Sequence, residues 1–257
     1  MKMITSLWLL LGSGATLAAS PFDGSWKIDL KSVNMTGKPD VYLLAKGEYT
    51  CSSCLPDLQI KADGAEHPVA DHTYYDTAIV KVTGPRSIEI TLKKGGKEFA
   101  HMIDTVSADG TTLTSRFRNH IGDQEVTGTV AERRVAAAPA GSHPVSGTWQ
   151  QQTFDASDAV KDIQYKMTAD GFHMSWAGQS YDARFDGREY PVKGDQGNTT
   201  VVLKKTDAHT VEETDRRDGK VVDVFRMTVA ADGRTIAVRD EDLDHEQVTT
   251  YRLVKQP

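Results

Sequence analysis

The chain has 257 residues, of which 39% are hydrophobic and 26% charged, and its formal net charge is −6. An acidic chain whose basic residues are scattered lacks the positive surface that neutralises phosphates, so we expect no nucleic-acid partner. Its length suits two domains, and no later segment approaches the roughly 20 apolar residues of a spanning helix, so we expect no membrane span.

Residues 1–20 begin with the basic Lys2, continue through the apolar stretch from Ile4 to Leu11, and end in small residues. This order is typical of a secretory signal peptide, and the stretch is too short to span a membrane. It predicts an exported protein that resides in the periplasm or outside the cell.

The rest of the chain contains one segment twice, at a fixed offset. Gly24-Ser25-Trp26 returns as Gly147-Thr148-Trp149, 123 residues later (147 minus 24). The same offset relates Pro68-Val69 to Pro191-Val192, and Ala108-Asp109-Gly110 to Ala231-Asp232-Gly233. Solenoid repeats recur every 20 to 50 residues or so, whereas a period of domain size indicates duplication of one folding unit. The sequence therefore predicts a first repeat over 21–134, a linker over 135–146 and a second repeat over 147–257.

Each repeat consists of short alternating segments separated by turn signals. Ser87 to Lys93 alternates apolar and polar residues, which is the period of a half-buried strand. Gly95-Gly96 and Asp109-Gly110 then turn the chain between further strands, and the second repeat has equivalent turns. Many short strands with almost no helical segment predict an all-β fold, either a sandwich or an up-and-down barrel.

The Gly-x-Trp motif near the start of each repeat resembles that of the lipocalin-like (calycin) β-barrels. The resemblance implies that Trp26 and Trp149 pack at the closed end of a barrel and that a basic residue near the last strand covers each indole. The candidates for this cover are Arg133 or Arg134 in the first repeat, and Arg252 or Lys255 in the second. The expected fold is two tandem antiparallel lipocalin-like β-barrels related by internal duplication.

A second resemblance concerns three segments of the second repeat. The segments from Asp186 to Gly194, from Asp218 to Val222 and from Ala230 to Ile236 are similar to recurring segments of exported bacterial tandem-repeat proteins of uncharacterised function. This resemblance implies a bacterial envelope or secreted location and no particular activity.

Cys51 and Cys54 are the only cysteines, and Met174 and Ala177 stand at the equivalent positions of the second repeat. In an exported protein such a pair is expected to form a disulfide, which predicts a structural clip. A redox-active pair and a metal-binding pair are the alternatives. A tetrahedral zinc site would need two further nitrogen or sulfur ligands, so we expect no metal and no cofactor.

The two repeats differ at positions that should face the interior. At the common offset, four apolar residues of the first repeat are replaced by charged ones, namely Ile90 by Glu213, Leu92 by Asp215, Ile103 by Arg226 and Phe117 by Asp240. If the register is kept, the second repeat carries these charges inward, where burial is costly unless they are paired or hydrated. A β-bulge that shifts the register by one residue would instead turn them to solvent.

These observations predict a non-enzymatic exported protein that binds a small apolar or amphipathic molecule in one or both barrels. An apolar first cavity would be lined by Trp26, Ile90, Leu92 and Phe117, and a more polar second one by Trp149, Glu213, Asp215 and Arg226. One alternative is an envelope protein with filled barrels that captures a protein partner through the loop of His72, Tyr74 and Tyr75. Another is an enzyme that uses Glu213 or Asp215 as acid or base. Because no standard catalytic motif occurs in the sequence, no catalytic residue is assigned.

Overall fold

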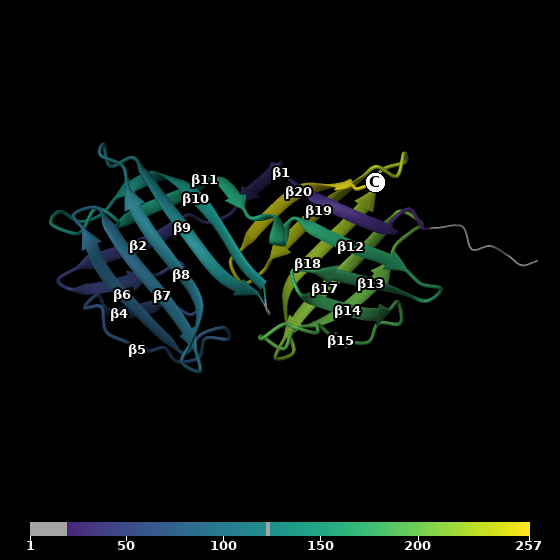
Figure 1. Cartoon of the computed structure of the whole chain (residues 1–257), viewed down its shortest axis with the longest axis horizontal. Helices are drawn as coiled ribbons and strands as arrows, with labels where there is room; N and C mark the ends of the chain where they lie inside the picture. Colours follow the sequence, from purple (N-terminus) through teal and green to yellow (C-terminus); the bar gives the residue numbers. More distant parts are fainter. Residues whose placement is uncertain (1–19, 122–123) are drawn as a thin grey trace, which may run out of the picture.

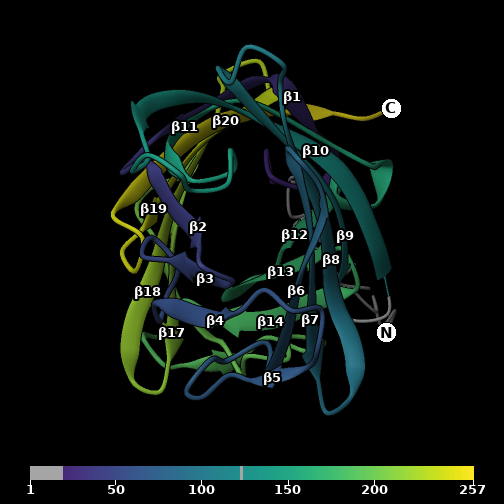
Figure 2. The same cartoon turned by 90° about the vertical axis from the view of Figure 1, so that its left-hand side faces the viewer.

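The computed structural model describes residues 20–121 and 124–257, so the predicted signal peptide lies almost wholly outside the described residues. It contains two ten-stranded antiparallel sheets, each rolled into a nearly closed barrel (Figures 1 and 2). The predicted all-β fold of two tandem barrels is thereby confirmed. In the part of the chain that is described, no helix combines the length and the apolar character needed to cross a membrane.

One sheet, which we call the N-terminal barrel, contains β2 (Asp40–Ala45), β3 (Glu48–Cys51), β4 (Leu58–Lys61), β5 (His67–Pro68), β6 (Thr77–Gly84), β7 (Ser87–Lys94), β8 (Lys97–Val106), β9 (Thr112–Ile121), β10 (Gln124–Ala137) and β11 (Gly147–Ala156). The other sheet, the C-terminal barrel, contains β1 (Gly24–Thr36), β12 (Asp162–Met167), β13 (Gly171–Trp176), β14 (Gln179–Arg184), β15 (Tyr190–Pro191), β16 (Thr200–Lys205), β17 (Thr210–Arg217), β18 (Lys220–Val229), β19 (Thr235–Asp242) and β20 (Gln247–Lys255). A single short 3₁₀ helix, η1 (Asp158–Val160), connects β11 to β12 within the described chain.

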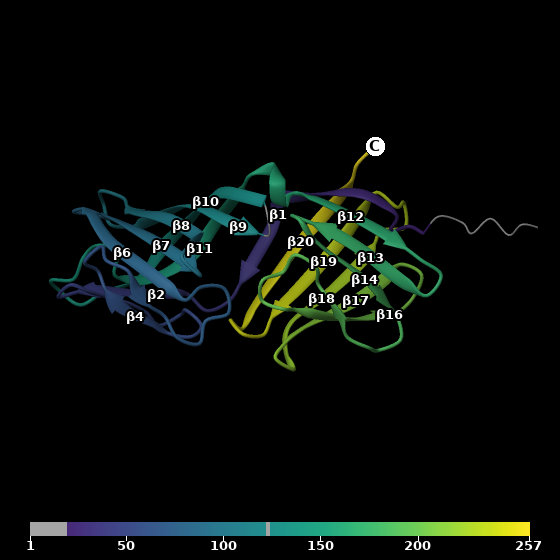
Figure 3. The same cartoon turned by 60° about the horizontal axis from the view of Figure 1, so that its bottom comes forward.

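The two barrels exchange their Gly-x-Trp strands. Strand β1 lies between β12 and β20 of the C-terminal barrel, where Trp26 is opposite Ile163 and Lys255 (Figure 3). Strand β11 lies between β2 and β10 of the N-terminal barrel, with Trp149 opposite Arg134. Each barrel therefore combines nine strands of one repeat with the first strand of the other, and the sequence repeats and the sheets differ by this strand.

The exchanged strands cross at the junction of the barrels, and an apolar cluster there connects the two barrels. The cluster consists of buried residues from both barrels and from η1, namely Val126, Ala156, Val160 and Ala177. Beside it, the ring of Phe117 stacks on that of Phe154 with 6.0 Å between centroids. Gly128 makes this arrangement possible, because a Cβ there would lie 2.4 Å from Cζ of Phe117.

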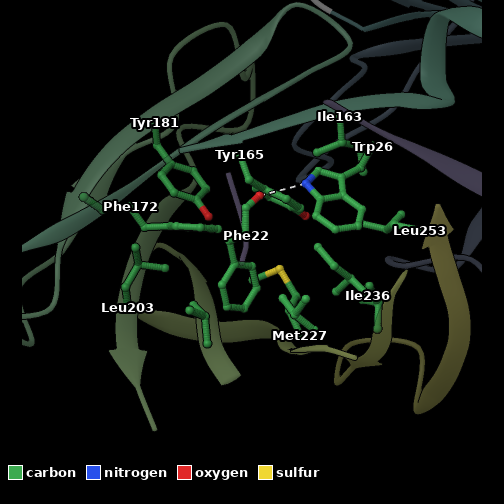
Figure 4. Packing of buried hydrophobic residues seen from close by; sticks show 14 of the residues in the cluster. Phe22, Trp26, Ile163, Tyr165, Phe172, Tyr181, Leu203, Met227, Ile236 and Leu253 are labelled. Atoms are coloured by element: carbon green, nitrogen blue, oxygen red, sulfur yellow. Dashed lines mark hydrogen bonds between the residues drawn. The ribbon is translucent and has the colours of Figure 1, made fainter. Parts of the chain in front are cut away.

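Each exchanged tryptophan is fully buried, at 0% exposure, in the core of the barrel that receives it. Trp26 packs with Ile163, Met227 and Leu253, and its Nε1 donates to the carbonyl of Phe22 at 2.8 Å (Figure 4). In the same way Trp149 donates to the carbonyl of Val145 at 2.9 Å. The expectation that Trp26 belongs to the interior of the first repeat and Trp149 to that of the second is wrong, because the strands that carry them are exchanged.

The cysteines are joined as predicted: Cys51, the last residue of β3, forms a disulfide with Cys54 in the following loop. Its Sγ lies in the N-terminal core beside Leu44 and Leu58. The pair therefore fastens the loop after β3 to the wall of the barrel.

A basic side chain covers each indole, but the two covers differ in strength. Arg134 lies 4.0 Å from the ring centroid of Trp149 and donates to the carbonyls of Gly110, Pro144 and Ser146 at 2.7, 2.6 and 2.5 Å. The Nζ atom of Lys255 lies 5.1 Å from the centroid of the Trp26 ring, its one aromatic contact of this kind in the described structure.

We expect Arg134→Met to lower the free energy of unfolding by about 2 to 4 kcal/mol, because three carbonyls lose a charged donor and the indole loses its cover. The matched variant Lys255→Met should cost less than about 1 kcal/mol, since it removes only the cation–π contact. Urea unfolding of both variants measures the difference. Equal losses would contradict the stabilising role of the three carbonyl hydrogen bonds.

Candidate functional site

A cavity of about 490 Å³ lies inside the C-terminal barrel, at the end that meets the N-terminal barrel. Its walls come from both barrels: the inner faces of β12, β13 and β17 to β20 surround it, and Tyr74, Phe99 and residues 119–121 of the N-terminal barrel contribute to its lining. A volume of this size is typical of small-molecule sites.

Most of the lining is apolar or aromatic. The aromatic side chains of the C-terminal barrel that line the cavity are Tyr165, Trp176, Phe225 and Tyr251, accompanied by aliphatic residues such as Met174 and Val238. Trp176 is held in place because its Nε1 donates to the carbonyl of Val160 at 2.8 Å. Strand alternation explains the composition: Phe225 and Met227 share the inner face of β18.

Carboxyl groups form the polar side of the cavity. Glu213, which is 7% exposed, and Asp215 lie on the inner face of β17, and Asp240 reaches the cavity from β19. The register of β17 with β18 is regular through Asp215 and shifts only after it. Of the two alternatives drawn from the sequence, the inward orientation of Glu213 and Asp215 is therefore the one that occurs.

The buried pair Glu213 and Asp215 shares a proton. Burial raises the pKa of both carboxyls, and the charge of Glu213 raises the pKa of Asp215 further. Asp215 therefore keeps its proton and donates it to Glu213, which also accepts a hydrogen bond from the Tyr181 hydroxyl at 2.5 Å. Because the pKa of Glu213 is itself raised to about 7, the pair carries less than one negative charge at neutral pH and approaches one as the pH rises above 7.

Two neighbouring carboxyls are shifted in the same direction. Burial, reinforced by the charge of Asp223, raises the pKa of Asp240 to about 7. Burial also raises the pKa of Asp223 to about 6, against the opposing effect of Arg217, whose Nη2 lies 3.7 Å from Oδ2 of Asp223. The site thus holds several carboxyls that are reluctant to ionise together.

The cavity wall also contains acceptors without donors. In residues 20–121 and 124–257, four fully buried side-chain oxygens lack a hydrogen-bond partner, and three of them belong to the cavity residues Asn119, Asp215 and Asp240. Unpaired buried acceptors are costly. The wall is therefore short of hydrogen-bond donors.

Tyr74, from the loop between β5 and β6 of the N-terminal barrel, covers the edge of the cavity. Its ring stacks on Phe99 with 5.7 Å between centroids, and the guanidinium carbon of Arg217 lies 5.3 Å from its centre. Gly197 of the C-terminal barrel allows this contact, because a Cβ there would lie 2.8 Å from the Tyr74 hydroxyl oxygen. The loop that the sequence offered as a protein-capture surface thus rests on the other barrel.

The remaining site residues expected from the sequence lie elsewhere. Ile90 and Leu92 pack in the core of the N-terminal barrel, and Phe117 lies at the junction. Arg226 does not face the interior: its half-exposed side chain lies 3.5 Å from Glu212 on the outer side of β18. That expectation is wrong because the inner face of β18 belongs to Phe225 and its neighbours at even spacing.

The interior of the N-terminal barrel is not purely apolar, contrary to expectation. Asp104 and Glu132 are only 6% and 4% exposed there. Burial raises the pKa of Asp104 to about 6, and burial together with the charge of Asp40 raises that of Glu132. The comparison of repeats missed these acids because it followed apolar residues of the first repeat that become charged in the second. At the same offset Asp104 is replaced by the apolar Met227, and Glu132 by Lys255, which is also charged.

The comparison of repeats did single out Asp240, as the charged counterpart of Phe117, whereas nothing in the sequence marked Trp176 or Tyr251 as residues of the cavity.

No protein-family model, curated protein or solved structure matches this chain. The fold and the site therefore define its class: a tandem β-barrel protein with an acid-lined cavity beside the junction of its barrels. No group of three or more His, Cys, Asp or Glu side chains in its described portion could hold a metal ion.

Proposed function

We propose that this protein is an exported, non-enzymatic binding protein that holds one small amphipathic molecule in the cavity of the C-terminal barrel. The observation that carries the proposal is the combination of an apolar wall with a few convergent polar groups around a space of about 490 Å³. Export is supported by the pattern of residues 1–20. The resemblance to lipocalin-like barrels supports the same use of a barrel interior.

The N-terminal barrel acts in this proposal as a lid. Tyr74 and Phe99 lie over the edge of the cavity, and Ile121 contributes an apolar surface. A ligand covered in this way loses contact with water over its apolar part, which favours binding by about 25 cal/mol per Å² of apolar surface buried.

Titration with the neutral fluorescent probe N-phenyl-1-naphthylamine tests the proposal. We expect saturable binding at one site in the wild type and at least a tenfold loss of affinity in Met174→Trp, because the indole would fill the cavity that Met174 lines. The matched control Leu243→Trp adds the same ring at an exposed position, 47% accessible, and should bind as the wild type does. Absence of probe binding to the wild type, or equal affinity of Met174→Trp, would refute the proposal.

A further inference from the structure

We infer that the ligand of this cavity is an organic cation, in which a protonated amine is joined to an apolar body. The inference rests on the proposed function and adds the chemical class of the molecule bound. Three features of the cavity support it: its balance of charge, its unpaired acceptors and its aromatic walls.

The balance of charge favours a positive ligand. Four carboxyls line the cavity, those of Asp195, Glu213, Asp215 and Asp240, against one guanidinium, that of Arg217. The guanidinium is engaged elsewhere, since it lies 3.7 Å from Asp223 and donates to the Thr199 hydroxyl at 3.1 Å. Asp215 stays protonated, but above the pKa values of Glu213 and Asp240, both raised to about 7, the lining carboxylates outnumber the guanidinium, so a cation would meet net opposite charge.

The unpaired oxygens of the cavity wall also favour a positively charged ligand. The side chains of Asn119, Asp215 and Asp240 approach the cavity from both barrels, and each has a buried oxygen without a donor. An ammonium group supplies up to three N–H donors and no acceptor, so it relieves this shortage as an anion or an ether cannot.

The aromatic side chains provide faces that attract a cation and so offset part of the hydration that it loses on entering the cavity. The rings of Tyr165, Trp176, Phe225 and Tyr251 line one cavity. A cation near an aromatic face gains about 0.5 to 2 kcal/mol. An apolar body attached to the amine would pack against the same rings and against Met174 and Val238.

Binding of a cation should release protons. The site holds its carboxyls partly protonated because burial and mutual repulsion raise their pKa values. A bound positive charge returns these pKa values towards their ordinary range, so affinity for the cation should rise as pH rises from 6 to 8. The charged or titratable groups that line or adjoin the cavity are Tyr74, His120, Tyr165, Tyr181, Asp195, Glu213, Asp215, Arg217, Asp223, Asp240, Glu241, Asp242, Asp244, His245 and Tyr251.

The test compares three probes with one body: 4-phenylbutylamine, 4-phenylbutan-1-ol and 4-phenylbutanoate. Isothermal titration at pH 8 should show the amine binding at least tenfold more tightly than the alcohol, with the carboxylate weakest. Between pH 6 and pH 8 the amine stays protonated, as a lysine side chain does, yet its affinity should increase while that of the alcohol stays constant. Proton release follows from the dependence of the measured heat on the buffer.

Asp240→Asn keeps the size of the side chain and removes its charge. We expect it to weaken the amine about tenfold and to leave the alcohol unchanged, whereas Asp232→Asn on an exposed turn should change neither. Glu213→Gln, which removes the charge of the buried pair, provides a second variant if Asp240→Asn folds poorly. If the alcohol binds as tightly as the amine, or the carboxylate binds most tightly, the inference of a cationic ligand is refuted while the proposed binding function stands. If no probe binds the wild type, the proposed function itself fails.

Discussion

Trp26→Ala is expected to lower the free energy of unfolding by about 3 to 5 kcal/mol and to loosen the C-terminal barrel rather than the N-terminal one. Trp26 is fully buried and packs against Ile163, Met227 and Leu253, all of which belong to strands of the C-terminal barrel. Its removal leaves a cavity between β1 and the strands beside it. The effect should therefore appear far along the chain from the substitution.

Hydrogen exchange measured by mass spectrometry locates the effect. In Trp26→Ala, amide exchange should accelerate in β12, β19 and β20, while β2 and β10 keep their protection. Trp149→Ala is the matched control and should give the opposite pattern, because β11 pairs with β2 and β10. If Trp26→Ala exposed β2 and β10 instead, the exchange of strands would be refuted.

The second large effect concerns the dependence of stability on pH. The folded state raises the pKa of Glu213, Asp215 and Asp240 above the values of the unfolded chain. The folded protein therefore binds more protons than the unfolded chain above about pH 4, and this contribution to stability is lost as pH rises towards 7 and beyond. Each such group contributes a slope of up to about 1.4 kcal/mol per pH unit.

Asp215→Asn should reduce this loss, since it removes one of the titrating carboxyls while its amide can still donate to Glu213. We expect the variant to be more stable than the wild type at pH 8, on the order of a few kcal/mol, and similar to it near pH 4. Calorimetric unfolding between pH 4 and pH 8 measures both values.

Asp109→Asn is a control of opposite sign. Hydrogen bonds from Ser107 and Thr111 lower the pKa of the exposed Asp109 to about 2, so its contribution is present above the unfolded pKa and lost as pH falls. That variant should lose stability at pH 8. A gain in Asp109→Asn, or a loss in Asp215→Asn at the same pH, would contradict the assignment of the buried acids.

The sequence predicted the two barrels but not their exchange of strands. Repetition at a fixed offset and alternation such as that of residues 87–93 depend on the chain alone, and the structure follows them. The exchange could not be predicted because Trp26 and Trp149 carry the same motif and find equivalent neighbours in either barrel. Which strand enters which barrel depends on the path of residues 37–39 and 157–161, where no residue pattern distinguishes the two connections.

The site shows the same division. Glu213 and Asp215 were placed inward from their offset to Ile90 and Leu92, which works because the register of β17 is regular as far as Asp215. The sequence did not indicate that Tyr74 and Asn119 line the cavity, since these residues reach it only because the two barrels lie side by side. Contacts between the two barrels depend on their three-dimensional fit, which periodicity along the chain does not encode.

The exchange of strands also affects the order in which paired strands become available during synthesis. Strand β1 ends at residue 36 and its partner β20 begins at residue 247, so at about 5 to 20 residues per second β1 waits roughly 10 to 40 seconds for that partner. Meanwhile β2 to β10 emerge, and until β11 follows, the position between β2 and β10 is vacant while β1 already carries the matching Gly-x-Trp motif. A chain that folds as it emerges therefore passes through a stage with one tryptophan strand and one barrel able to receive it, in which β1 competes with β11 for the position between β2 and β10.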